Sequence, residues 1–194
     1  MAAGLIFQHG VAATSIDDVR RAAKVSGSQM AHYFPDKRTL IRAVIEHQAE
    51  SVLQAHQHPA LGRLDSFEAL EAWAELNVEQ QRQQRFRGGC MLGSLAGQLL
   101  ESDPTVRVDL VLGFERWEAL LREGLVAVRE RGDLRPDADP GELALVLLTA
   151  AQGGVLLTQT RRHAAPLEAA LASALAYVRS FAPTPRRRRA AASR

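Results

Sequence analysis

The sequence predicts an all-α protein in which a small N-terminal three-helix head precedes a larger helical body. Residues that favour helices, above all alanine, leucine, glutamine, glutamate and arginine, are abundant. Apolar residues recur at intervals of three and four, as on one face of a helix, and few stretches alternate β-branched residues. The length of 194 residues suits one domain or two small domains that share a core.

The first strong element is a short helix that is expected to end near Ala23. Thr14 and Ser15 are suitable N-caps, because their hydroxyls can accept from free N–H groups of the first turn. The two aspartates that follow favour the positive end of the helix dipole. Ile16 and Val19 lie at helical spacing and mark the buried face.

A second short helix is predicted over Gly27 to Tyr33, with Ser26 as its cap. Met30 and Phe34 would face inward. The side chains left to face outward are Ser28, Gln29 and His32. Two short helices joined by a tight turn form the helix-turn-helix pattern. Small polar side chains on its second helix suit the major groove of DNA, where they meet base edges.

Two further helices complete the predicted head. A helix over Met1 to His9 precedes the motif, with Gly10 as its C-cap. A long helix follows the motif, begins around Lys37 and ends near His56. A cation in a first turn is disfavoured by the helix dipole, so Lys37 indicates a phosphate partner; the alternative is a solvated lysine. Pro59 marks the joint between head and body.

The body is predicted to contain five helices. They start near Asp65, Cys90, Pro104, Pro140 and Pro166. The stretch from Leu143 to Thr160 carries no charge and is apolar nearly all round, so it must be covered on nearly all sides. A second copy of the chain is the simplest cover. The stretch is about as long as a membrane span, but its glutamines, threonines and glycines favour a buried helix.

The segment GLIFQHGVAATSIDDVRRAAKVSGSQMAHYFPDKRTLIRAVIE resembles the DNA-binding domain of TetR/AcrR-type transcriptional repressors. The matching marks are Phe7, Gly10, Thr14-Ser15-Ile16, Ala22-Ala23, Val25-Ser26, Tyr33-Phe34, Asp36-Lys37 and Leu40. The later GCMLGSLAGQL is similar to one branch of that family's sensor domains. Two departures are a shorter first helix and Ala31, where the family usually has a phosphate-gripping tyrosine; Tyr33 would partly compensate.

The resemblance implies a domain order and a function. Residues 1–57 would form the DNA-binding domain, 58–182 the sensor and dimerisation domain, and 183–194 a disordered basic tail. The expected function is a cytoplasmic homodimeric repressor without a cofactor. It would leave a palindromic double-stranded DNA operator when a small, neutral or hydrophobic effector binds.

The resemblance also implies three sets of site residues. The DNA-binding set is Thr14, Ser26, Gly27, Ser28, Gln29, His32, Tyr33 and Lys37. The ligand-binding set is Trp73, Asn77, Met91, Leu95, Phe114, Trp117 and Gln152. The last two helices of each subunit would form the dimer interface, with Leu143, Leu147, Ala150, Gly154, Leu157, Leu171, Leu175 and Val178. For the aromatic residues, the alternative is ordinary core packing.

Other functions were weighed on the same residues. Cys90 follows two glycines at a helix start and is a candidate thiol sensor, or else a small buried hydrophobe. His47, His56 and His58 lack a completing carboxylate or cysteine, so no metal site is expected. No phosphate loop, nucleophile elbow or carboxylate pair indicates an enzyme. A helical dimer with weakened or lost DNA binding is the other alternative.

Charge and cysteine content fit an intracellular regulator. Formal net charge is +2, but five arginines lie in the last twelve residues, so the remainder carries 19 basic and 22 acidic residues, a net of −3. A nearly neutral body argues against non-specific coating of polyanions, although not against a local basic site. The single cysteine excludes an internal disulfide, and no signal peptide or membrane segment is expected.

Overall fold

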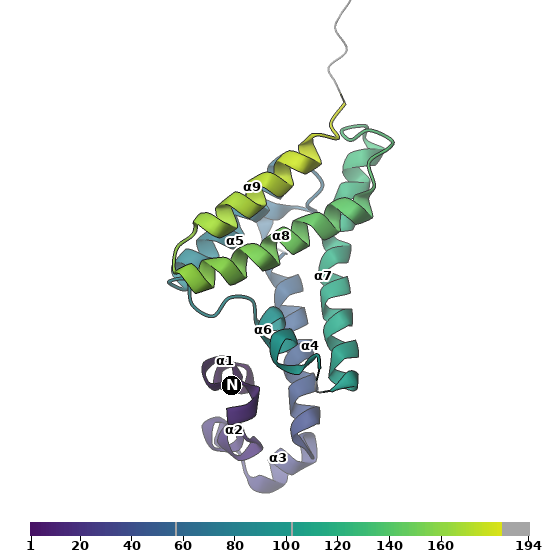
Figure 1. The fold of residues 1–194 in the computed structure, drawn as a ribbon. Helices are drawn as coiled ribbons and strands as arrows, with labels where there is room; N and C mark the ends of the chain where they lie inside the picture. The colour runs from purple at the N-terminus through teal and green to yellow at the C-terminus, as the bar shows by residue number, and fades with distance from the viewer. Residues whose placement is uncertain (57, 102, 184–194) are drawn as a thin grey trace, which may run out of the picture.

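The computed structural model describes residues 1–56, 58–101 and 103–183, and in these ranges every regular element is helical. Figure 1 shows a head of short helices at one end of the molecule and a body of longer helices at the other, joined by α4. The all-α prediction is confirmed. The tail predicted for residues 183–194 lies outside the described residues from residue 184 onward.

The head is built on three short helices with a small core. They are α1 (Ala2–Ala13), α2 (Ile16–Ala23) and α3 (Gly27–Tyr33). Val19, Met30 and Leu40 are buried against one another and hold α2, α3 and the start of α4 together. Ser15 and Ser26 each form a capping box at the start of α2 and α3. The predicted ends of both helices are therefore confirmed.

Gly10 breaks the first helix as predicted: its φ of 81° and ψ of 165° are not helical, and a second short helical segment follows it within the bounds of α1. The break frees the N–H of Val11, which donates to Oε1 of Gln98 in α6 at 2.8 Å. The prediction that Thr14 caps the start of α2 was wrong: Ser15 is the N-cap, whereas Thr14 is the C-cap residue of α1, is only 4% exposed and donates its hydroxyl to the Gly10 carbonyl at 2.8 Å.

The long helix α4 (Lys37–Ala55) belongs to both the head and the body. Its first turns bury Leu40 in the head core, and its middle buries Ile45 against α6 and α7. Arg42 pairs with Asp109 of α7 at 2.6 Å. Such exposed pairs stabilise weakly, so the apolar contacts fix α4 in place. Any movement of α4 therefore moves the head.

The body wraps a second, larger core. Its elements are η1 (Pro59–Leu61), α5 (Phe67–Gln83), α6 (Met91–Leu99), α7 (Pro104–Glu130), α8 (Pro140–Arg161) and α9 (Ala165–Arg179). In Figure 1, α8 and α9 lie side by side across one end of α7. By length and composition α8 could cross a membrane, yet 44% of its apolar 18-residue stretch is buried inside the chain.

Candidate functional site

The outer face of α3 is a row of exposed polar groups on a fixed base. Ser28, Gln29 and His32 are exposed, whereas Met30 on the opposite face is 5% exposed and anchored in the head core. Tyr33 at the end of the helix is 69% exposed. A polar face of this kind suits contact with the base edges of DNA, and the helix is held from behind by its apolar face.

Gln29 is exposed and also caps the N-terminus of α3. Its Oε1 accepts from the N–H of Ser26 at 2.9 Å, and the Ser26 hydroxyl accepts from the N–H of Gln29 at 3.1 Å. Two amide N–H donors and a second oxygen lone pair stay available for a base. Gln29 is therefore held in one orientation before any DNA arrives.

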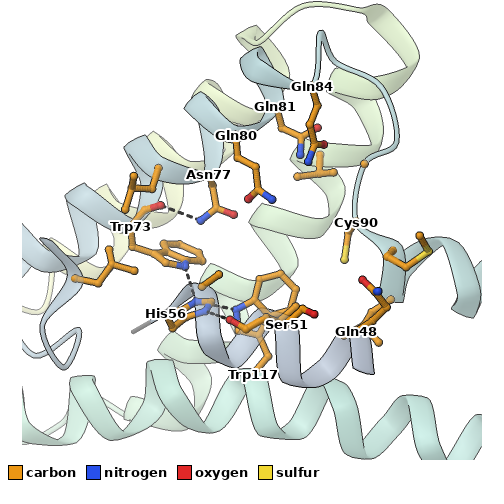
Figure 2. Close-up of a pocket in the computed structure, with 18 of the residues that line it drawn as sticks. Gln48, Ser51, His56, Trp73, Asn77, Gln80, Gln81, Gln84, Cys90 and Trp117 are labelled. Atoms are coloured by element: carbon orange, nitrogen blue, oxygen red, sulfur yellow. Dashed lines mark hydrogen bonds between the residues drawn. The ribbon is translucent and has the colours of Figure 1, made fainter. Parts of the chain in front are cut away.

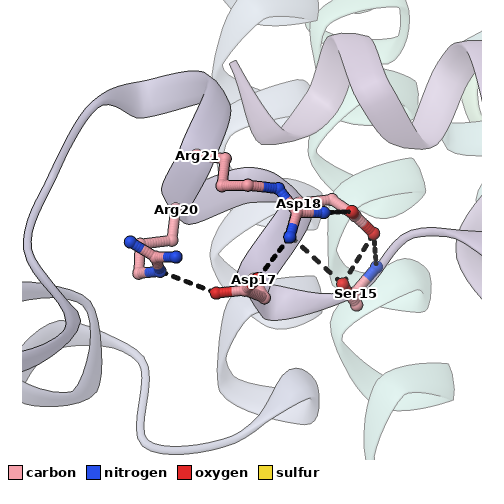
Figure 3. A network of polar contacts seen from close by, with 5 residues as sticks. All are labelled: Ser15, Asp17, Asp18, Arg20 and Arg21. Atoms are coloured by element: carbon pink, nitrogen blue, oxygen red, sulfur yellow. Dashed lines mark hydrogen bonds and ion pairs between the residues drawn. The ribbon is translucent and has the colours of Figure 1, made fainter.

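The charges of α2 neutralise one another. Figure 3 shows the network, in which Arg20 donates to Asp17 at 2.7 Å and Arg21 pairs with Asp17 and Asp18. The hydrogen bond from Arg20 lowers the pKa of Asp17, and hydrogen bonds from Ser15 lower that of Asp18. Both carboxylates stay charged at neutral pH, so the two arginines carry little net charge toward a polyanion.

The cations left for phosphate in the head are lysines. Arg38 and Arg42 pair with aspartates at the start of α7, at 2.8 and 2.6 Å. Within residues 1–56, the lysine and arginine side chains outside ion pairs with carboxylates are therefore Lys24 and Lys37. Lys37 is half-buried, and its Nζ donates to the Ala12 carbonyl at 3.3 Å, which positions the ammonium beside the helix-turn-helix. Its other donors suit a phosphate.

A cavity of about 280 Å³ lies in the body between α4, α5, α6 and α7. Figure 2 shows its side chains. Four predicted ligand residues line it, namely Trp73, Asn77, Met91 and Trp117. Cys90, the predicted thiol, lines it as well, and its sulfur accepts from the Gly93 N–H at 3.5 Å. The volume is near the lower end of the range for small-molecule sites.

His56 and the two tryptophans form one end of the cavity. Nε2 of His56 accepts from the indole N–H of Trp73 at 3.0 Å and of Trp117 at 3.1 Å. Nδ1 lies 2.7 Å from the Val52 carbonyl, so it carries the proton and the ring is neutral. Both ring nitrogens are engaged, and among the described residues no cluster of three histidine, cysteine, aspartate or glutamate side chains could hold a metal.

The burial of His56 predicts a loss of stability in mild acid. Burial lowers the pKa of His56 below its ordinary 6.5. As pH falls through about 6.5, the unfolded chain binds a proton that the folded chain refuses until its lower pKa is reached. The free energy of unfolding should therefore drop between about pH 7.5 and about pH 5.5, measured by urea titration. His56→Gln should flatten that slope, whereas His47→Gln on the exposed face of α4 should not.

Three glutamines at the end of α5, the last of them its C-cap residue, were not predicted from the sequence. Gln80, Gln81 and Gln84 line the cavity together with Asn77. They follow Asn77 at intervals of three, four and seven, which places all four on one helix face. Figure 2 shows them as a row leading away from the Trp73 end. That spacing could have predicted the row of carboxamides on α5. His56, Gln48 and Phe7 also line the cavity, but they come from other helices, so no spacing along the chain links them to it.

Three predicted ligand residues lie outside the lining. Leu95 is fully buried in the core between α1, α4, α6 and α7. Phe114 packs between the two body clusters. Gln152 lies on α8, and its Nε2 is buried without a hydrogen-bond partner.

Most of the predicted dimer residues are core residues of a single chain. Leu143, Leu147, Gly154, Leu171 and Val178 are buried because α8 and α9 pack on each other and on α5 and α7. Ala150 and Leu175 are half-buried, and Leu157 is exposed. The large apolar side chains that α8 and α9 expose are Leu145, Leu156, Leu157 and Tyr177. Of the five residues predicted on α8, only Leu157 is exposed.

An all-helical chain whose head displays a polar helix, and whose body encloses a cavity reached by α4, has the architecture of a DNA-binding transcriptional regulator. Residues 1–44 match the model of bacterial regulatory proteins of the tetR family, and residues 66–174 match that of the tetracyclin repressor-like C-terminal domain. The chain belongs to the TetR family of transcriptional regulators.

Relatives support the same class. The chain is 29% identical to an uncharacterised helix-turn-helix regulator of Mycobacterium tuberculosis, over 86% of this chain and 84% of the relative. It is 24% identical to the transcriptional repressor DhaR of a Mycobacterium species, over 84% and 81%. A TetR regulatory protein of Rhodobacter sphaeroides superimposes with a TM-score of 0.74 at 25% identity, covering 90% and 94%. Reduced NemR of Escherichia coli has the same fold, with a TM-score of 0.79, 24% identity and 95% coverage of both chains.

Proposed function

We propose that the chain is a homodimeric repressor that a small uncharged effector releases from a near-palindromic operator. The observation that carries the proposal is the exposed face of α3, held from behind by Met30 and flanked by the ammonium of Lys37, which donates to a backbone carbonyl and forms no ion pair with a described carboxylate. Two such helices in a symmetric dimer would reach two half-sites about one DNA turn, or a multiple of it, apart. The related DhaR is named a repressor, which favours that direction of control.

The proposed dimer surface is the exposed apolar face of α8 and α9. Leu156 is 62% exposed, Leu145 53% and Leu157 48%, on a helix with no charged residue from 143 to 160. A contiguous apolar surface of this kind marks an interaction site. Symmetric pairing of the same face on a second copy would cover it.

The cavity is lined in part by α1, which belongs to the head, and by α4, which joins the head to the body. Gln48 and Ser51 come from α4, and Phe7 comes from α1. The Phe7 ring lies against Gly88, which has a φ of 91° and where an added Cβ would overlap the ring at 1.6 Å. Gln98 of α6 holds the break in α1. An effector that shifts α6 or Phe7 would therefore shift α1 and α4 together, and would release DNA if it prefers the shifted state.

A second candidate function is covalent sensing through Cys90. The observation that favours it is the position of the thiol at the N-cap of α6, on the cavity wall and half-buried. Modification of the thiol would place a group inside the same cavity that an effector would fill.

Operator binding tests the proposal through Lys37→Ala. Loss of one phosphate contact in each subunit of the dimer should weaken binding to all sequences about equally and reduce the slope of log affinity against log salt by about 2. Fluorescence anisotropy with DNA from the chain's own upstream region is the measurement. Arg122→Ala, which removes one exposed charge from α7, should leave both quantities unchanged. A wild-type chain that bound this DNA no better than random DNA would refute the proposal.

A further inference from the structure

The lining of the effector cavity combines apolar side chains with polar groups that carry no charge. Among the described residues that line it, none is aspartate, glutamate, lysine or arginine, and five are carboxamides, Gln48, Asn77, Gln80, Gln81 and Gln84. His56 adds no charge, because burial lowers its pKa and both its nitrogens are engaged. A ligand ion would lose its hydration here without a counter-charge, which is costly.

One carboxamide of this wall is buried without a hydrogen-bond partner. Gln81 is 4% exposed, and its Oε1 is enclosed and accepts no hydrogen bond. A leucine at this position would avoid the cost of an unsatisfied acceptor. A neighbour on the same helix, Asn77, is already satisfied, because its Nδ2 donates to the Trp73 carbonyl at 2.8 Å. Gln81 is thus the lining group that most needs a donor from a ligand.

The opposite end of the cavity has a donor in excess. Trp73 and Trp117 both direct their indole N–H groups at the one lone pair of His56 Nε2. Neither donor has an acceptor to itself, so a ligand carbonyl oxygen could take one of them. The indole and imidazole rings also offer flat apolar surface, which suits a planar ring.

We propose that the cavity selects a small uncharged molecule that combines a planar ring with an amide-like group, the ring lying against the tryptophan and histidine rings at one end and the group donating its N–H or O–H to Gln81 toward the other. The inference rests on the proposed effector site and adds the chemical class of the effector. Carboxylates and ammonium ions are excluded by the uncharged wall. Purely apolar molecules gain the ring contacts but leave Gln81 unsatisfied.

Four matched probes test the chemical class: benzamide, benzoate, benzylamine and toluene. Both tryptophans of the chain line the cavity, so quenching of intrinsic tryptophan fluorescence reports this site. Benzamide should bind at least about tenfold more tightly than each of the other three at neutral pH. Equal binding of benzoate or benzylamine would overturn the proposal. So would the absence of any response to benzamide up to its solubility limit.

Substitution of Gln81 tests the anchoring residue. Gln81→Leu should raise the Tm of the free protein, since it removes an unsatisfied polar group, and should weaken benzamide binding about fivefold or more. Toluene binding should be unchanged or stronger in the same variant. Gln81→Met provides a second variant of similar volume. Gln83→Leu, on the exposed side of the same helix, should leave all four affinities unchanged. Unaltered benzamide binding in both Gln81 variants would refute the anchoring role.

These titrations need no DNA, so their outcome is separable from the proposed repressor function. Operator binding that persists while benzamide shows no preference would refute the effector class alone. Selective benzamide binding by a chain that ignores its upstream DNA would instead refute the repressor function.

Discussion

Replacing Gly124 by alanine is expected to lower the free energy of unfolding by about 3 kcal/mol or more, as overpacking of a rigid contact does. A Cβ at this position of α7 would lie 2.2 Å from the carbonyl oxygen of Leu64 and 2.9 Å from that of Arg63. Both are backbone atoms and cannot rotate aside. Leu64 is itself 3% exposed and holds a left-handed φ of 56°, so the loop before α5 has little freedom to retreat.

Gly97→Ala supplies the matched control for this substitution. Gly97 lies inside α6, and an added Cβ would meet no heavy atom within 4 Å. Alanine there should stabilise the protein by about 0.5 to 1 kcal/mol, because glycine is the poorer helix former. Urea unfolding followed by circular dichroism measures both variants. If both changed the unfolding free energy alike, the close approach of α7 to the Leu64 loop would be disproved.

Replacing Leu156 by arginine is expected to convert the dimer to a monomer and to weaken operator binding by about 100-fold or more. Leu156 is 62% exposed in the chain, so the change leaves the monomer core intact. In the proposed dimer it would bury a charge in an apolar contact, where no acid lies on α8 from residue 143 to residue 160. Loss of the second head removes half of the DNA contacts. Sedimentation velocity gives the mass and anisotropy the affinity.

A second exposed leucine separates a specific interface from general solubility effects. Leu112 on α7 is 52% exposed, near Val108 and Val111, and lies on a helix outside the proposed dimer surface. Leu112→Arg should keep the dimer mass and the operator affinity of the wild type. A monomeric Leu112→Arg chain, or a Leu156→Arg chain that stayed dimeric, would place the interface elsewhere.

The head could be predicted from the sequence because its signals are local. Ser15 and Ser26 set the starts of α2 and α3 through bonds to residues three positions away, so neighbouring residues suffice to find them. Thr14 shows the limit of such signals. It has the chemistry of a cap, but the break at Gly10 turns its hydroxyl inward, and a break of this kind depends on Gln98 in a distant helix.

The outward face of α8 could not be predicted from composition. The helix is apolar on nearly all sides, so its sequence does not indicate which side meets its own chain. Leu143 and Leu147 turned out to be buried, whereas Leu145 and Leu156 are exposed, because α9 and α7 cover one side. Only the positions of those neighbouring helices distinguish the two faces.

The cavity was predicted in part. Trp73, Asn77 and Trp117 stood out as large or polar groups on apolar faces, and all three line it. Leu95 and Phe114 have the same apolar pattern but fill the core, since periodicity separates buried from exposed faces and not core from cavity. His56 was considered only as a metal ligand, because its two indole partners lie 17 and 61 residues away in the sequence.

The capping box of α3 affects how descendants of this protein could acquire new operators. A mutation at Gln29 would change a side chain that we propose to face the bases and, at the same time, remove the group that closes the start of the helix. Such a mutation carries a folding penalty of up to about 1 kcal/mol. His32, whose ring meets the Tyr33 ring edge-on, takes no part in the capping box of α3. Evolutionary divergence in target sequence should therefore begin at His32 and reach Gln29 late.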